Sequence, residues 1–265
     1  MRVLVVFAHP EERSFSAALK DRAVDELARQ GHEVVVSDLY RMGWPTLLQP
    51  DELVSGDSGP DPALADITAG GWTHSAPRLH TDVEVEQAKV AQADLVLFHF
   101  PLWWFSMPAV MKGWVDRVFS RGFAYSTGRK YSRGHFVGKR AMLCITTGTA
   151  STRYEPHGID GDLHHVLWPI QNGILAYAGF TVLPPFTAWM PADVGATERA
   201  GYLERYGERL RELDEAEPLF FHPVEDYDRT QRLLPGVKAR SGVQWNPHAG
   251  QTFESAAADF TPRTP

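Results

Sequence analysis

A strand, a helix and a second strand open the chain in close succession. Residues 3–7 form an apolar, largely β-branched run, which is typical of a strand buried on both faces. Apolar residues then recur at helical spacing from Phe15 to Leu27, Gly31 ends that helix, and residues 32–39 restore a strand pattern. Two strands joined through a helix form a parallel pair with a right-handed crossover, so this opening predicts an α/β fold.

The same alternation continues through most of the chain. It predicts, in order, a helix over 83–93, a strand over 95–100, a helix over 109–119, a strand over 140–146, a helix over 163–178, a strand over 180–183 and a helix over 199–213. Five strands alternating with helices indicate a doubly wound five-stranded parallel sheet of the flavodoxin type.

Two segments break the alternation. Residues 45–80 are rich in proline and glycine and form a long irregular excursion, which in a compact domain is usually functional or mobile. Beyond residue 217 aromatic residues are scattered among prolines and glycines without a period. We therefore expect a domain over 1–217 and a C-terminal extension over 218–265 that packs on the domain or on a neighbouring subunit.

Composition excludes several classes of function. The formal net charge is -7 with no block of Lys or Arg, which argues against nucleic acid as a partner. Cys144 is the single cysteine, so the chain has no internal disulfide, as is usual in a reducing compartment. No apolar run approaches the roughly 18 residues that a membrane span needs. We expect a cytoplasmic protein with no membrane insertion.

The loop after the first strand suits a phosphate group. It leads directly into a helix, whose first N–H groups and positive dipole end favour an anion, and His9, Arg13 and Ser14 lie beside it. The alternative is that Ser14 only caps the helix and His9 only forms a turn. No Walker motif and no G-x-G-x-x-G motif follows any of the predicted strands.

Two further loops suit a planar ligand. The strand over 95–100 ends in an apolar turn that can stack on a flat ring, made of Pro101, Leu102, Trp103, Trp104 and Phe105, although such aromatics also occur as plain core. The loop that starts at Thr146, Thr147, Gly148 and Thr149 is small and polar, so its amides can meet the polar edge of a ring. A phosphate seat, a stacking wall and a polar edge together favour a flavin.

The residues also carry a family resemblance. The segments FAHPEERSFSAALK, SDLY, ADLVLFHFPLWWFSMPAVMKGWVDRVF, FAY, ITTG, GIDGDLHHVLWPIQNGIL and GF, spread in order over residues 1–215, resemble NAD(P)H:quinone oxidoreductases of the DT-diaphorase type. The resemblance implies a flavodoxin-like homodimer with one FAD per subunit, FMN being the less favoured flavin. It also implies two-electron, ping-pong hydride transfer from NADH or NADPH to a quinone.

The resemblance further implies roles for individual residues. His9, Phe15, Ser16 and Ala17 would flank the pyrophosphate and ribose, Pro101, Leu102, Trp104 and Phe105 the flavin ring, Thr146, Thr147 and Gly148 its polar edge, and Arg199 the adenine. Tyr154 matches the catalytic tyrosine of the family. Trp104, Phe105 and Gly148 would line the nicotinamide and quinone pocket, to which the other subunit would contribute Tyr125 and Tyr177.

This chain departs from the family pattern at three positions. Arg13 replaces a threonine and can add a charge-assisted contact to the pyrophosphate. Thr127 replaces a second tyrosine, which predicts a more open pocket. Asp160 stands where the family has its catalytic histidine, and an ionised carboxylate cannot stabilise negative charge on the flavin. Two hypotheses follow: Tyr154 acts with His157, or burial and nearby negative charge keep Asp160 protonated. The alternative is that neither residue reaches the flavin and that Tyr154 acts with backbone amides.

Other functions compete with this interpretation. Asp160, Asp162, His164 and His165 resemble metal ligands, but an acidic helix N-terminus explains them better, and we predict no metal. A flavin-bearing regulatory subunit of a membrane transport system is the main alternative, and it would need partner contacts from residues 45–80 or 218–265. A ligand-binding module without redox activity is a weaker one.

Overall fold

The computed structural model describes residues 1–48 and 80–259, and these contain every predicted strand and helix. Its main elements, in chain order, are β1 (Arg2–Phe7), α1 (Phe15–Arg29), β2 (Glu33–Asp38), α4 (Thr81–Gln92), β3 (Leu95–Pro101), α5 (Ala109–Val118), β4 (Arg140–Thr147), α6 (Leu163–Ile170), β5 (Thr181–Val182), β6 (Phe186–Trp189), α7 (Ala196–Arg211) and α8 (Phe253–Asp259). Most of the predicted excursion, residues 49–79, lies outside the described residues.

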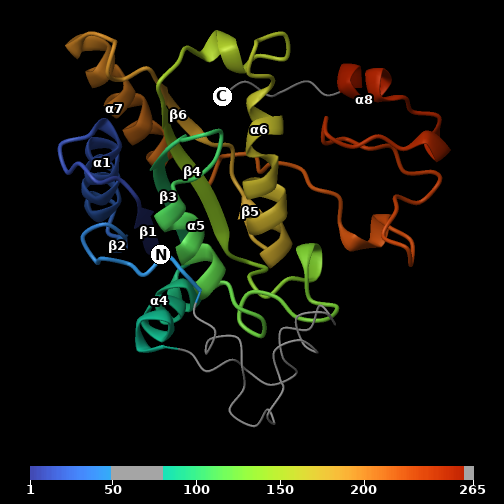
Figure 1. The fold of residues 1–265 in the computed structure, drawn as a ribbon, viewed down its shortest axis with the longest axis horizontal. Coiled ribbons are helices and arrows are strands. Elements are labelled where there is room, and N and C mark those ends of the chain that lie inside the picture. The colour runs from blue at the N-terminus through green and yellow to red at the C-terminus, as the bar shows by residue number, and fades with distance from the viewer. Residues whose placement is uncertain (49–79, 260–265) are drawn as a thin grey trace.

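The strands form one parallel sheet in the order β2-β1-β3-β4-β5, which confirms the doubly wound flavodoxin-type topology (Figure 1). The register places Val5 opposite Val36 on one side and Leu97 on the other, and Leu97 opposite Met142. The order reverses beyond β1, between β1 and β3, so the loops that follow these two strands diverge to opposite faces of the sheet. In such sheets ligands bind at this switch point.

The last position of the sheet holds two short strands where we predicted one. The N–H of Leu183 still donates to the carbonyl oxygen of Ala141. Pro184 and Pro185 follow and have no N–H group, so the ladder stops there. The chain rejoins β4 as β6, in register with Cys144–Thr147. This second contact carries Trp189 to the carboxyl edge of the sheet.

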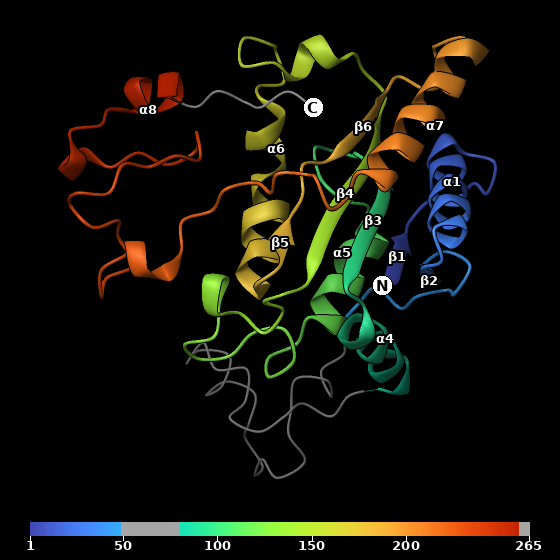
Figure 2. The ribbon, with the colours of Figure 1, turned by 180° about the vertical axis from the view of Figure 1, so that it is seen from behind.

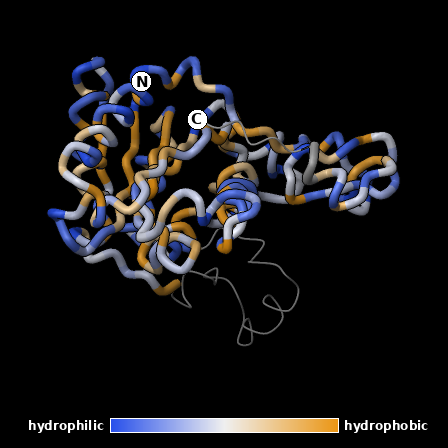
Figure 3. The backbone as a smooth tube through the Cα atoms, turned by 90° about the horizontal axis from the view of Figure 1, so that it is seen from above, coloured by the Kyte–Doolittle hydropathy of each residue, from blue (hydrophilic) through white to orange (hydrophobic). Residues whose placement is uncertain are grey.

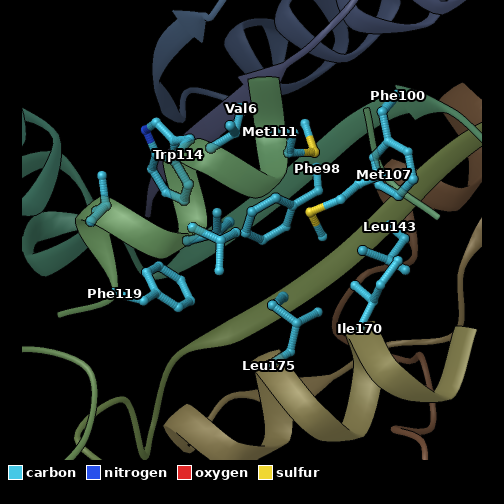
Figure 4. Packing of buried hydrophobic residues seen from close by; sticks show 14 of the residues in the cluster. Val6, Phe98, Phe100, Met107, Met111, Trp114, Phe119, Leu143, Ile170 and Leu175 are labelled. Carbon is cyan, nitrogen blue, oxygen red and sulfur yellow. The ribbon is translucent and has the colours of Figure 1, made fainter. Parts of the chain in front are cut away.

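Helices cover both faces of the sheet (Figures 1 and 2). Helices α1 and α7 pack on one face over Val3, Val5 and their neighbours. Helices α4, α5 and α6 pack on the other, over Leu4, Val6 and the alternate residues of β3 and β4. Figure 4 shows this second core, in which Trp114 lies close to the central strands. Burial on both faces explains the continuous apolar runs of the strands.

The C-terminal extension projects from its own domain (Figure 3) and contacts it both near its start and further along, where Nε2 of His165 lies 2.8 Å from the carbonyl oxygen of Gly242. Arg133 pairs with Glu225 at 2.7 Å, and the ring of Trp168 packs on Phe221. Further along, polar side chains bind the backbone; the Gln251 side chain, for example, bonds both the N–H and the carbonyl of Ala239. Packing on a neighbouring subunit stays a prediction. In the described part of the chain, no helix combines the length and the apolar character needed to cross a membrane.

Candidate functional site

A cleft of about 840 Å³ opens at the carboxyl ends of β1, β3 and β4. It is lined by most of the residues that the sequence predicts to bind the cofactor or act in catalysis: His9, Arg13, Phe15, Ser16, Pro101, Leu102, Trp103, Trp104, Thr146, Thr147, Gly148, Thr149, Tyr154 and Arg199. Ser14 and Ala18 line it as well. The volume lies within the roughly 300–1,000 Å³ that small-molecule sites occupy.

The start of α1 provides a seat for an anion. Ser14 caps the helix, because its hydroxyl accepts the N–H of Ala17 at 3.1 Å. Among the described residues, the N–H groups of Phe15 and Ser16 have no hydrogen-bond partner, and both residues line the cleft. Ala17 itself is buried behind this surface and does not line it. The 15-residue helix therefore directs unpaired donors and its positive dipole end into the cleft.

His9 stands beside this seat as a neutral ring. Its Nδ1 lies 3.0 Å from the backbone nitrogen and 3.1 Å from the carbonyl oxygen of Glu11, so Nδ1 is engaged with the backbone. Burial lowers the pKa of His9 below its usual value, which keeps the ring uncharged near neutral pH. Arg13 is exposed and pairs with Glu11 at 3.2 Å.

The aromatic turn after β3 has an unusual backbone. Trp103 and Ser106 exchange two backbone hydrogen bonds, and the two residues between them, Trp104 and Phe105, have φ angles of 50° and 60°. This left-handed conformation normally selects Asn or Gly, and it costs roughly 1–3 kcal/mol at each bulky residue. The turn holds Trp104 with 94% of its surface exposed at the cleft. Strain of this kind points to a binding role.

The loop after β4 forms the polar side of the cleft. The hydroxyls of Ser16 and Thr146 lie 2.9 Å apart, which ties α1 to β4 at the base of the cleft. Thr147 donates its hydroxyl to the carbonyl of Thr149 at 2.8 Å. Thr149 Oγ1 is buried without a hydrogen-bond partner among the described residues, although its residue lines the cleft. Because buried hydroxyls seldom remain unpaired, this atom fits a polar ligand edge.

Arg199, near the start of α7, lines the cleft as well. Its guanidinium donates to the carbonyls of Pro191 and Val194, which fixes the loop that follows β6. Pro191 and Ala192 of that loop also line the cleft, and the sequence analysis missed them. The Pro184-Pro185 break was the signal that could have revealed a further strand and this loop.

Tyr154 lies between two aromatic rings. Its ring centroid is 5.3 Å from that of Trp189 and 6.4 Å from that of Phe105. Its hydroxyl has no hydrogen-bond partner among the residues described, and the residue lines the cleft. Phe105 contacts Tyr154 without itself lining the cleft. Tyr154 is thus held rigidly with its hydroxyl available.

The structure gives Asp160 a different partner from those we expected. Arg153 binds both carboxylate oxygens of Asp160, at 2.7 and 2.9 Å. This pairing lowers the pKa of Asp160, so the hypothesis that burial keeps it protonated is wrong. His157 is 85% exposed and its ring faces Glu155 at 3.2 Å. Neither Asp160 nor His157 lines the cleft within the single chain.

The remaining nominated residues lie elsewhere in the single chain. Tyr125 and Thr127 line a second cleft, and Tyr177 packs against Tyr125 with centroids 5.8 Å apart. In the described ranges, no three His, Cys, Asp or Glu side chains gather into a group that could hold a metal ion.

Comparison with known proteins places this geometry in a family. Residues 1–211 match the family model described as a flavodoxin-like fold. The human ribosyldihydronicotinamide dehydrogenase [quinone] is 41% identical over 221 residues, which are 82% of this chain and 94% of that protein. The rat NAD(P)H dehydrogenase [quinone] 1 is 39% identical over 227 residues, covering 86% and 82%.

A solved structure agrees with these relatives. A protein of Klebsiella pneumoniae assigned as a quinone reductase superposes with a TM-score of 0.79 at 41% identity, covering 89% of this chain and 94% of its own. The chain therefore belongs to the flavodoxin-like family, in the group that contains the NAD(P)H and ribosyldihydronicotinamide quinone dehydrogenases.

Proposed function

We propose that the protein is an FAD-dependent NAD(P)H:quinone oxidoreductase that works as a homodimer in the cytoplasm. The observation that carries the proposal is the first cleft, where an anion seat, an exposed aromatic turn and a polar loop meet. A flavin bound there would supply two-electron hydride transfer from a nicotinamide to a quinone. The names of the human and rat relatives, which are quinone dehydrogenases, agree with this proposal.

The residues of the cleft fit a flavin nucleotide. The N–H groups of Phe15 and Ser16 would bind phosphate oxygens, with the His9 ring beside them. The Trp104 turn would stack on the ring system, and Thr149 Oγ1 would meet its polar edge. Arg199 also lines the cleft, and FAD has an adenine that Arg199 could contact whereas FMN has none, so we favour FAD over FMN.

Tyr154 is the residue that we expect to stabilise negative charge during hydride transfer. Its hydroxyl is available, and its ring is fixed between two aromatic neighbours. The hydrogen bond to Asp160 is the main reason that the pKa of Arg153 is raised, and the neighbouring Tyr154 makes a smaller contribution in the same direction. Asp160 holds this guanidinium through two bonds. We infer that Arg153 supplies the positive charge that a histidine supplies in the family, and that Asp160 positions Arg153.

Steady-state kinetics test this division of roles. We expect Tyr154→Phe to lower kcat for menadione by ten- to a hundredfold, because one transition-state donor is lost. Asp160→Asn should lower kcat by a smaller factor, because Arg153 loses its charged partner. His157→Ala should retain the wild-type rate. A normal rate for Tyr154→Phe, or a large loss for His157→Ala, would contradict the assignment.

The donor is tested in the same assay. NADH, NADPH and dihydronicotinamide riboside should be compared, because the relatives include dehydrogenases named for the ribosyl donor. Turnover with none of the three would reject the enzyme proposal. The regulatory-subunit alternative would gain support if the protein copurified with a membrane transporter and turned over slowly alone.

Dimerisation is part of the proposal because Tyr125 and Tyr177 lie away from the first cleft of their own chain. In a dimer, the Tyr125 and Tyr177 side chains of one subunit could lie at the first cleft of the other subunit. Sedimentation of the purified protein at twice the mass of 29.6 kDa would support the dimer. A monomer with full activity would contradict it.

A further inference from the structure

Trp189 packs against Tyr154 from outside the first cleft. It is the last residue of β6, and its ring centroid lies 5.3 Å from that of Tyr154, with the two ring planes 38° apart. Tyr154 lines the first cleft, whereas Trp189 does not. The Trp189 ring therefore affects a ligand in that cleft through the position of Tyr154.

The backbone of Trp189 is fixed by three features. The register of β6 on β4 sets Trp189 opposite Thr147. The hydroxyl of Tyr202, on α7, donates to the carbonyl oxygen of Trp189 at 3.2 Å. Met190, the next residue, donates its N–H to the carbonyl oxygen of Thr147 at 3.1 Å and has a φ angle of 48°. This left-handed conformation is strained at a residue other than glycine, and it persists only where the surrounding structure enforces it.

Tyr154 depends on its ring neighbours for its position. It belongs to the short helix η2 (Ser151–Tyr154), of which it is the buried residue. Phe105, its other ring neighbour, is more distant, with centroids 6.4 Å apart, and is 48% exposed. Trp189 is the closer ring, and it packs against the hydrophobic cores on both faces of the sheet. It thus connects Tyr154 to the rigid part of the fold.

We propose that Trp189 is a positioning residue that holds the hydroxyl of Tyr154 in place for hydride transfer. The inference rests on the proposed function, because Trp189 acts on the reaction through that hydroxyl. Removing the Trp189 ring leaves space into which Tyr154 can tilt, and misplacing a catalytic group by about 1 Å can lower a rate by up to about a hundredfold. Trp189→Leu loses the flat ring but remains apolar, whereas Trp189→Phe keeps a ring.

A double-mutant cycle on the rate of flavin reduction tests the proposal. The FAD-loaded protein is mixed anaerobically with NADH in a stopped-flow instrument. We expect Trp189→Leu to lower the rate by about tenfold and Trp189→Phe to restore most of it. In the Tyr154→Phe background, Trp189→Leu should change the rate by less than about twofold, because no hydroxyl remains to be misplaced. A loss that persists in full in this background would overturn the inference.

Phe186→Leu is the matched control. Phe186 lies on the same strand, but its ring packs on Tyr206, with centroids 4.6 Å apart, in the core on the other face of the sheet. This variant also removes one ring from β6, so we expect it to lower the thermal midpoint without slowing flavin reduction. Equal losses of rate in Phe186→Leu and Trp189→Leu would show a general effect on β6 and would overturn the inference.

Limited proteolysis follows the position of Tyr154 without turnover. Arg153 is exposed and precedes Tyr154, so trypsin can cut the bond between them when η2 opens. We expect purified Trp189→Leu to be cut there faster than the wild type, and Trp189→Phe and Phe186→Leu to be cut at the wild-type rate. The mass of the fragments identifies the cut.

The two measurements separate this inference from the proposed function. If Tyr154→Phe slows flavin reduction and Trp189→Leu does not, the inference fails and the proposed function stands. If NADH reduces no flavin, the proposed function fails, and the cleavage rates alone decide whether Trp189 holds Tyr154. Faster cleavage in Trp189→Leu would then support that contact, and an unchanged cleavage rate would overturn it.

Discussion

Acid sensitivity of the fold should depend strongly on one buried histidine. His99 lies on β3 with 1% of its surface exposed. Its Nε2 bonds the hydroxyl of Tyr206 on α7 at 3.0 Å, and its Nδ1 has no partner among the described residues. The protonated ring carries an N–H on both nitrogens, so its Nδ1–H would lie in the core without an acceptor. Burial accordingly lowers the pKa of His99 to about 3.

The sign and size of the effect follow from linkage. A histidine with a pKa near 6.5 when unfolded and about 3 when folded binds more protons in the unfolded state between these values. The free energy of unfolding therefore falls as the pH is lowered through 6.5. From pH 7.5 to pH 5.0 the loss attributable to His99 is about 2 kcal/mol.

Urea denaturation at pH 7.5 and 5.0 measures this loss. His99→Gln cannot titrate, and its amide oxygen can still accept from Tyr206, so the variant should lose about 2 kcal/mol less than the wild type over this range. His99→Phe tests the same point without a polar group. The other histidines titrate equally in all three proteins and cancel in the comparison. Equal losses in wild type and both variants would refute the reasoning.

Three more predictions concern the first cleft and the loop between Arg153 and Asp160. Gly158→Ala should lower the thermal midpoint, because a Cβ there would lie 2.3 Å from the carbonyl oxygen of Arg153; differential scanning calorimetry would detect this, and an unchanged midpoint would contradict it. Trp104→Ala should leave stability unchanged, since the side chain is 94% exposed, while weakening flavin retention in equilibrium dialysis. Ser16→Ala should lower the free energy of unfolding, measured by urea denaturation, by about 1 kcal/mol, because it removes the hydrogen bond to Thr146. An unchanged free energy of unfolding would show that this hydrogen bond does not stabilise the fold.

The sequence predicted the architecture because the central strands are apolar on both faces and the helices are periodic. Strand Leu95–Pro101 and helix Ala109–Val118 lie within one or two residues of the predicted bounds. The positions of glycine and proline predicted where the helices end and where the loops lie. The three loops of the cleft could also be predicted, because the carboxyl ends of parallel strands lie at one edge of the sheet.

Other features depend on contacts that a linear pattern does not contain. Strand β6 is only four residues long and forms because β4 extends beyond the proline break. Helix α6 continues past Pro169 into a π-helical turn, η3 (Gln171–Ala176), which divides the single predicted helix. The Arg153–Asp160 pair requires a chain reversal between the two residues, so the sequence suggested a buried acid where the structure has an ion pair.

The C-terminal extension was the least predictable segment. Side chains form hydrogen bonds with its backbone groups; the Asn246 side chain, for example, donates to the carbonyls of Leu234 and Val237. Such contacts leave no hydrophobic period to detect.

The central claim is that the first cleft holds a flavin that accepts hydride from a nicotinamide. The most direct test is the absorbance spectrum of the purified protein before and after anaerobic addition of NADPH, with the released cofactor identified by mass. The account predicts a yellow protein that bleaches on NADPH and releases FAD. A colourless protein that neither FAD nor FMN can reconstitute would contradict it.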